Sequence, residues 1–236
     1  MVFMKRIAFF LVICIALGLP PLTAHGSQAH TVYRNVDTEE RIVAITFDDG
    51  PHPRYTAEIL DLLAQYDAKA TFFVIGKNLE LYGDLTRRAA EEGHEIGNHT
   101  YTHSSLRPLD RAAIEREITE SAGLIERCIG RRPDVFRPPG GAFSRLTEDV
   151  ASKHGEKIIL WSVDTRDWAG RPSAEIVEVV MRDTVPGSII LFHDYAAQNS
   201  TTVAALKEIL PRLSAAGYRF VTVSELILCA VSAGGE

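Results

Sequence analysis

The chain has 236 residues, of which 46% are hydrophobic and 24% charged, so it can bury one substantial core and has the composition of an ordinary globular protein. Its formal net charge is −6 at pH 7, and its basic residues form no stripe along the sequence. An acidic chain of this kind binds nucleic acid poorly, so we predict that nucleic acid is not a partner.

The first 29 residues have the pattern of a secretory signal peptide. Lys5 and Arg6 precede an apolar run over residues 7–19, which two prolines end. This run is shorter than the roughly 20 residues that a transmembrane helix needs, and it matches the apolar region of a signal peptide. We therefore predict cleavage after Ala29, or less favourably after Ala24, and export to the periplasm or the extracellular space with no stable membrane span. An uncleaved N-terminal anchor is the alternative.

After a polar stretch at 30–41, which we expect to be a linker, strand and helix signals alternate. Runs rich in β-branched and aromatic residues predict strands at 42–47, 70–74, 94–98, 135–137, 157–163, 188–192 and 219–223. Apolar residues at helical spacing predict helices at 55–66, 79–92, 110–128, 147–154, 173–184, 201–216 and 224–228. Pro211 should kink or restart its helix, and Ser173 should cap the helix that it begins.

About seven strands alternating with helices predict a single α/β domain at 42–229, with a mostly parallel sheet or barrel, and a C-terminal tail at 230–236. In such folds the functional side chains lie at the carboxyl ends of the strands. Polar residues follow five of the predicted strands at this point: Asp48 and Asp49, His99, Arg137, Asp167 and His193. We therefore expect these side chains to gather at one end of the sheet.

Asp48 and Asp49 stand side by side at the end of an apolar strand, directly before Gly50-Pro51. Neighbouring side chains at a strand end point in different directions, so one carboxylate can bind a metal ion while the other accepts a proton. Two carboxylates so close together repel each other unless a cation or an arginine offsets their charge, and Arg137 is the candidate. The alternative is a structural pair that caps backbone amides, with Arg137 in a surface salt bridge.

His99 and His103 lie four residues apart in a polar segment that we expect to be a loop entering a turn. Two imidazoles and one carboxylate make a three-ligand metal site that leaves positions open for water and substrate. Without such a carboxylate, the pair would be weak evidence for a metal.

Two further strand ends carry residues suited to chemistry on a sugar. Asp167-Trp168 places an acid that can orient a neighbour beside a ring that can stack on a sugar; an N-cap next to a core tryptophan is the alternative. His193 ends a buried strand, where a histidine is commonly structural, but next to a metal site it becomes a candidate general acid.

Cys128 and Cys229 would remain after removal of the signal peptide. Their separation in sequence leaves open whether they pair. The sequence has no Cys-x-x-Cys motif, which argues against a cysteine-based zinc site.

In this order, these residues resemble the five motifs of the polysaccharide deacetylases of the NodB-homology type, carbohydrate esterase family 4. The matching segments are Thr46-Phe47-Asp48-Asp49-Gly50, His99-Thr100-x-x-His103, Arg137-x-Pro139-x-Gly141, Asp164-x-x-Asp167-Trp168 and Leu191-x-His193. The resemblance covers about residues 43–226, and five ordered motifs are far more specific than any one of them. It implies a distorted (β/α) barrel and a divalent metal ion, with zinc first and cobalt, nickel or manganese as alternatives.

The resemblance also implies roles for the residues. Asp49, His99 and His103 would bind the metal, Asp48 would be the general base tuned by Arg137, and His193 would be the general acid oriented by Asp167. The backbone N–H of Gly140 would help to hold the oxyanion, and substrate would contact Trp168, Leu191, Phe192 and Pro139. Gly140 stands where the family often has a tyrosine or another large residue, so a wall of the pocket is missing, and Phe192 is expected to refill part of that space.

We therefore expect metal-dependent hydrolysis of N-acetyl groups from N-acetylglucosamine units of an exported glycan (peptidoglycan, chitin or chitooligosaccharide), with release of acetate. The alternatives are an O-deacetylase of the acetylxylan type, a non-catalytic glycan-binding protein on the same fold, and an iron oxygenase that uses two histidines and one carboxylate. An oxygenase would leave Asp48, Arg137 and His193 without clear roles. The sequence does not determine the oligomeric state.

Overall fold

Strands and helices alternate along residues 32–195 and 200–233, which are the residues that the computed structural model describes. The strands are β1 (Val32–Tyr33), β2 (Ile42–Asp48), β3 (Ala70–Val74), β4 (Glu95–Asn98), β5 (Val135–Phe136), β6 (Lys157–Ile159), β7 (Val163–Asp164), β8 (Ile189–His193) and β9 (Arg219–Phe220). The helices are α1 (Tyr55–Ala64), α2 (Gly76–Glu91), α3 (Arg111–Ile129), α4 (Arg145–Lys153), α5 (Ser173–Asp183), α6 (Thr202–Ala215) and α7 (Val223–Ala233), with short 3₁₀ turns η1 (Pro139–Gly141) and η2 (Asp167–Ala169).

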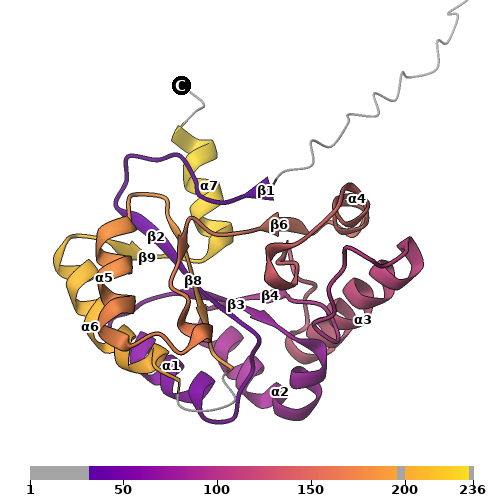
Figure 1. Cartoon of the computed structure of the whole chain (residues 1–236), viewed down its shortest axis with the longest axis horizontal. Coiled ribbons are helices and arrows are strands. Elements are labelled where there is room, and N and C mark those ends of the chain that lie inside the picture. The colour runs from indigo at the N-terminus through magenta and orange to yellow at the C-terminus, as the bar shows by residue number, and fades with distance from the viewer. Residues whose placement is uncertain (1–31, 196–199, 234–236) are drawn as a thin grey trace, which may run out of the picture.

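In this part of the chain the strands form one sheet, and neighbouring strands pair in parallel. Eight strands follow the order β1-β6-β5-β4-β3-β2-β8-β7, and β9 pairs with the beginning of β2. β6 and β7 lie toward opposite ends of this order, yet only residues 160–162 separate them in sequence. The covalent chain therefore bridges the gap where strand pairing stops. The sheet is the predicted distorted (β/α) barrel, with helices around it (Figure 1).

Side chains on each strand alternate between two apolar layers. On β2, Ile42 and Ala44 pack inside the barrel with Phe73 of β3. Phe47 faces outward, into the cluster that contains the buried faces of α1, α2, α5 and α6. Asp48 continues the inward series, so the alternation of β2 places this carboxylate in the interior at the carboxyl end of the barrel.

The amino end of the barrel is closed by α7. Leu226 and Ile227 pack in the same interior cluster as Ile42 of β2. The Glu95 carboxylate, at the start of β4, accepts a hydrogen bond from the backbone N–H of Ser224 at 3.1 Å and holds the first turn of α7 in place. Because apolar side chains close this end, polar side chains are left to gather at the other.

The structure differs from the prediction at both ends of the domain. Within the expected linker, Val32–Tyr33 form β1, which pairs with β6, and Val36 is buried. The expected tail begins inside α7, which extends to Ala233. The predicted signal peptide lies outside the described residues, among which no helix is long and apolar enough to cross a membrane.

Three local predictions inside the domain are wrong. The strand expected at 157–163 is two strands, β6 and β7, which pair with different neighbours. Pro211 lies inside α6, which neither kinks nor restarts there, because Leu206, Leu210 and Leu213 keep its apolar face packed against the core. Pro172, and not Ser173, is the N-cap of α5, and no side chain caps that helix.

Cys128 and Cys229 are both unpaired. Cys128 lies against the outer apolar cluster, whereas Cys229 lies against the interior one. The fold thus separates the two thiols, whose pairing the sequence had left undecided.

Candidate metal centre and active site

The carboxyl ends of two pairs of adjacent strands, β2 with β8 and β4 with β5, deliver predicted site residues to the same end of the barrel. Asp48 ends β2 and pairs in register with His193, which ends the adjacent strand β8. Asn98 ends β4 and pairs with Phe136 of β5, so His99 and Arg137 directly follow two neighbouring strand ends. Parallel pairing therefore brings together residues that lie up to 145 positions apart in the sequence.

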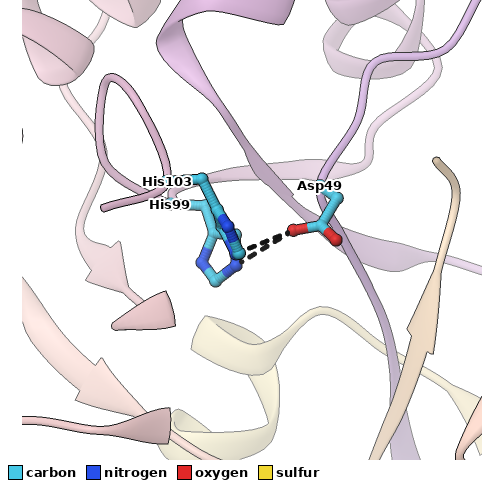
Figure 2. Close-up of side chains that lie close together, drawn as sticks. All are labelled: Asp49, His99 and His103. Carbon is cyan, nitrogen blue, oxygen red and sulfur yellow. Dashed lines mark ion pairs between the residues drawn. The ribbon is translucent and has the colours of Figure 1, made fainter. Parts of the chain in front are cut away.

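The side chains of Asp49, His99 and His103 converge on one point (Figure 2). The Oδ1 atom of Asp49 lies 3.3 Å from Nε2 of His99 and 3.2 Å from Nε2 of His103. Two ligand atoms bound to the same zinc ion in tetrahedral geometry lie about 3.4 Å apart. The three atoms that face one another thus have the spacing of a metal-ligand set.

The protonation pattern of these residues also suits a divalent cation. The Oδ1 atom of Asp49 is buried and has no hydrogen-bond partner among the described residues, which is costly unless a cation neutralises it. Nδ1 of His99 lies 2.6 Å from the backbone carbonyl of Arg137, which can only accept, so Nδ1 donates a proton to it and Nε2 is the nitrogen that faces Asp49. A metal-binding histidine typically donates its other N–H in this way.

The charges at this point depend on one another. Burial opposes ionisation of Asp49, but His99, and more weakly His103 and His193, outweigh it and lower the pKa of Asp49 to about 2. Burial also opposes protonation of the histidines. Asp48 and Asp49 overcome it at His99 and raise its pKa, whereas at His103 burial and the charge of His99 prevail and lower its pKa. Asp49 is therefore a permanent anion, and His103 is the imidazole that is more easily kept neutral.

The loop that carries the two histidines has an unusual backbone, which other side chains fix in place. Thr100 and His103 adopt positive φ angles of 69° and 62°. The Glu117 carboxylate on α3 accepts hydrogen bonds from the backbone N–H groups of Tyr101 (3.1 Å) and Thr102 (2.8 Å), and from the Thr102 hydroxyl (2.6 Å). No sequence motif marks Glu117, because a glutamate on a helix looks like any surface acid until the loop is placed beside it.

Asn98 also helps to fix the loop that carries the two histidines. Its Oδ1 accepts a hydrogen bond from the Thr100 N–H at 3.0 Å, and its Nδ2 donates to the carboxylate of Glu156, which is buried. Burial raises the pKa of Glu156 well above its ordinary value, so this carboxyl favours its neutral form. Asn98 and Glu156 had no signal in the sequence beyond their position at the end and the beginning of strands.

Arg137 is buried inside the barrel and offsets the charge of Asp48. Its Nη1 donates to Oδ1 of Asp48 at 2.7 Å and to the Thr46 hydroxyl at 2.8 Å. The remaining donors reach the backbone carbonyls of Ile159 (Nε, 3.2 Å) and Leu160 (Nη2, 2.9 Å), at the gap between β6 and β7. Arg137 is thus not in a surface salt bridge, which was the alternative from the sequence.

His193 is held by Asp167. Its Nδ1 lies 2.8 Å from Oδ1 of Asp167, and its backbone N–H donates to Oδ2 of the same carboxylate at 2.8 Å. Thr202, which the sequence analysis missed, donates its hydroxyl to Oδ2 at 2.7 Å. Burial opposes protonation of His193, but Asp167, with smaller effects of Asp48 and Asp49, raises its pKa to about 9. At neutral pH this histidine is protonated and can give up the proton on Nε2.

Of three side chains predicted to contact substrate, two are placed at the site and one is not. Trp168 is 64% exposed, so it is free to contact a ligand and is not the core tryptophan of the alternative. Leu191 lies on the same face of β8 as His193, but Phe192 points the other way, is fully buried and stacks on Phe47. The structure therefore does not bring Phe192 to the site, and this side chain cannot refill space near Gly140.

Gly140 lies in the exposed turn η1, whereas Pro139 before it is buried. Its φ angle is 61°, and a Cβ atom added there would meet no atom within 4 Å. The wall that a large residue would form at this position is therefore absent, as predicted, and the space is open.

The fold and the site together define an α/β-barrel protein with a polar, titratable centre at the carboxyl ends of its strands. The family profile described as polysaccharide deacetylase matches residues 35–159. A peptidoglycan-N-acetylglucosamine deacetylase of Bacillus cereus is 44% identical over 194 residues, which cover 81% of this chain and 91% of that protein. The chain belongs to the polysaccharide deacetylase family.

Solved structures agree with this assignment. The crystal structure of a peptidoglycan N-acetylglucosamine deacetylase in complex with a substituted N-oxidanyl-benzamide has a TM-score of 0.82 and 36% identity, and covers 84% of this chain and 94% of that one. A family 4 acetyl xylan esterase from Clostridium thermocellum, in complex with a cobalt ion, has a TM-score of 0.75 and 33% identity, with coverage of 80% and 91%.

Proposed function

We propose that this protein removes N-acetyl groups from N-acetylglucosamine units of an extracytoplasmic glycan, with peptidoglycan as the first candidate, and releases acetate. The convergence of His99 and His103 on Oδ1 of Asp49, a buried carboxylate oxygen with no hydrogen-bond partner among the described residues, carries this proposal. The similarity to a peptidoglycan-N-acetylglucosamine deacetylase over most of both chains supports the choice of substrate.

Asp49, His99 and His103 would hold the divalent cation, for which zinc suits one carboxylate and two imidazoles. When bound, such a cation lowers the pKa of a coordinated water and polarises a carbonyl oxygen. Every other step falls to side chains of this chain.

Asp48 would accept a proton from the water that attacks the acetamide carbonyl carbon. Arg137 holds one oxygen of this carboxylate at 2.7 Å, which orients it and offsets its charge in the buried site. The N–H of Gly140 would donate to the developing oxyanion, and the loss of one such donor typically costs about 2.7–4 kcal/mol of transition-state stabilisation.

His193 would then give its Nε2 proton to the nitrogen as the C–N bond breaks, because without that proton the nitrogen would have to leave as an amide anion, a poor leaving group. The products are acetate and a glucosamine unit. The pairing of Asp48 with His193 across β2 and β8 supports a base and an acid on two sides of one substrate group. Trp168 and Leu191 would line the pocket that receives the sugar and its acetyl group.

Acetate release from peptidoglycan, chitooligosaccharides and acetylxylan, with chelation followed by metal add-back, tests the proposal. We expect release from the first two substrates, loss of release after chelation, and recovery with zinc or cobalt. Asp48→Asn should abolish release while the protein still binds the metal, whereas Asp61→Asn, at an exposed ion pair with Arg88, should have no effect. Full activity of Asp48→Asn would refute its role as the base, and release from acetylxylan alone would favour the O-deacetylase.

A further inference from the structure

The segment after β2, the start of α1 and the segment after β8 place three aromatic rings next to one another at the carboxyl end of the barrel. His52 lies four residues after Asp48, and Tyr195 lies two residues after His193. The imidazole of His52 stacks on the ring of Tyr55, with 4.6 Å between centroids and 22° between planes. The ring of Tyr195 meets His52 edge-on at 5.0 Å and 82°.

The segments that carry these rings are packed tightly onto each other. Thr56 accepts a hydrogen bond from the His52 N–H at 2.7 Å, and its hydroxyl donates to Oδ2 of Asp194 at 2.5 Å. Asp194 also donates its backbone N–H to the carbonyl of Asp48 at 3.1 Å, and its carboxylate lies where a Cβ atom of Gly50 would be. The aromatic group is therefore fixed relative to the catalytic carboxylate.

Hydrogen bonds also determine the tautomer of His52. Nδ1 lies 3.1 Å from the backbone N–H groups of both Arg54 and Tyr55, so it is an acceptor and the proton resides on Nε2. Burial, and the charge of Arg54, lower the pKa of His52, which keeps the ring neutral. His52 thus offers one N–H donor in a fixed orientation, and this donor has no protein acceptor among the described residues.

Exposed aromatic surface is concentrated at this end of the molecule. Tyr195 is 40% exposed, and it and Trp168 are the two aromatic residues among the large hydrophobic side chains that are exposed in the described part of the chain. Trp168 directly follows Asp167 in η2, and Tyr195 lies two residues after His193, the last residue of β8. A flat ring with a polar tip fits a sugar, because the C–H face of a pyranose stacks on the ring while hydroxyl and acetamide groups need hydrogen bonds.

We propose that His52, Tyr55 and Tyr195 form a subsite for a sugar unit next to the one that is deacetylated, a proposal that rests on the proposed function. Tyr195 provides the stacking surface, Tyr55 supports the imidazole from behind, and Nε2–H of His52 donates to an oxygen of the neighbouring N-acetylhexosamine. The protein therefore recognises a chain of linked sugars and not a single sugar unit.

Acetate release from chitotetraose and from diacetylchitobiose by the metal-loaded protein tests this subsite. Tyr195→Ala should lower the ratio of kcat/KM for the longer glycan to that for the shorter one about tenfold, as expected for the loss of one aromatic contact and the surface that it buries. Tyr195→Phe keeps the ring and should retain the ratio, and His52→Phe keeps the stack but loses the donor, so its ratio should fall. Val185→Ala, exposed before the amino end of β8, is the matched control.

An unchanged ratio in Tyr195→Ala, with acetate released from both glycans, would overturn the subsite and leave the proposed function intact. If the wild-type protein releases acetate from neither of these two glycans, calorimetric binding of chitotetraose decides on the subsite, and acetate release from peptidoglycan decides separately on the proposed function. Binding weakened about tenfold by Tyr195→Ala would support the subsite, and equal affinity or no binding to the wild-type protein would overturn it.

Discussion

At the scale of single residues, the site separates the tasks of acids that look alike in the sequence. Asp48 and Asp49 are adjacent, but Asp48 is bound by Arg137 inside the barrel, whereas Asp49 adopts a φ angle of 75° and turns its Oδ1 toward two imidazoles. Asp167 holds His193. The environment of each carboxylate, and not its residue type, assigns its role.

The charge of Asp167 should be visible in the pH dependence of the reaction. Asp167 raises the pKa of His193 to about 9, so Asp167→Asn should let that pKa fall toward its ordinary value of 6.5. An imidazole that acts as an acid works only when protonated, so activity is lost as pH rises through its pKa. The alkaline limb of kcat/KM against pH should therefore move from near pH 9 toward pH 6.5.

Asp183→Asn is the matched control for this pH profile, because Asp183 is an acid in an exposed ion pair with Arg182. Its alkaline limb should coincide with that of the wild-type protein. An unmoved limb in Asp167→Asn would mean that ionisation of His193 does not limit the reaction.

At the scale of elements, the predicted helices and strands are largely correct where a local pattern is strong. The strand predicted at 70–74 has the bounds of β3. The helix predicted at 110–128 is α3, which Asp110 caps with a hydrogen bond from the Ala113 N–H and which ends at Gly130 with a φ angle of 77°. The loop at 99–103 has no such local determinant, because its shape depends on Glu117 from α3 and Asn98 from β4.

This dependence predicts that Glu117 controls metal affinity without touching the metal. Glu117→Ala removes three hydrogen bonds from the loop and should weaken zinc binding about 10–100-fold, as is typical when a group that orients metal ligands is lost. Competition with a fluorescent zinc chelator measures the affinity directly, with no need for turnover.

Glu126→Ala, on the same helix but in an exposed pair with Arg132, should retain the wild-type affinity for zinc. If Glu117→Ala binds zinc as tightly as this control, the loop holds its shape without the carboxylate and Glu117 has no positioning role.

At the scale of the whole molecule, Arg137 joins the stability of the barrel to its chemistry. Residues 160–162 connect β6 to β7, and these two strands do not pair with each other. The guanidinium of Arg137 binds the carbonyls of Ile159 and Leu160 at this break in the sheet. Its flat face lies 4.1 Å from the ring centroid of Phe73 in the barrel interior. One side chain therefore binds both the carbonyls at the break in the barrel and the Asp48 carboxylate.

Arg137→Met should lower the free energy of unfolding by about 3–5 kcal/mol, because it leaves the buried charge of Asp48 without its partner. Urea denaturation followed by circular dichroism measures this loss. Asp48→Asn in the Arg137→Met background should recover part of it, because the two residues interact and their effects are not additive.

Arg219→Met is the matched surface control, because Arg219 forms an ion pair with Glu40 in which both side chains are exposed. It should cost less than about 1 kcal/mol. Equal losses in the two variants would show that the buried pair contributes no more than the exposed one.

The sequence by itself determined the alternation of strands and helices, the family and the candidate residues, because these depend on local periodicity and on short ordered motifs. Tertiary structure alone decided the contacts that no motif marks. It split the predicted strand at 157–163 between two edges of the sheet, turned Phe192 into the core, and placed Glu117, Asn98 and Thr202 behind the site residues. Parallel pairing of distant strands sets these contacts, and the spacing of residues along the chain carries no record of it.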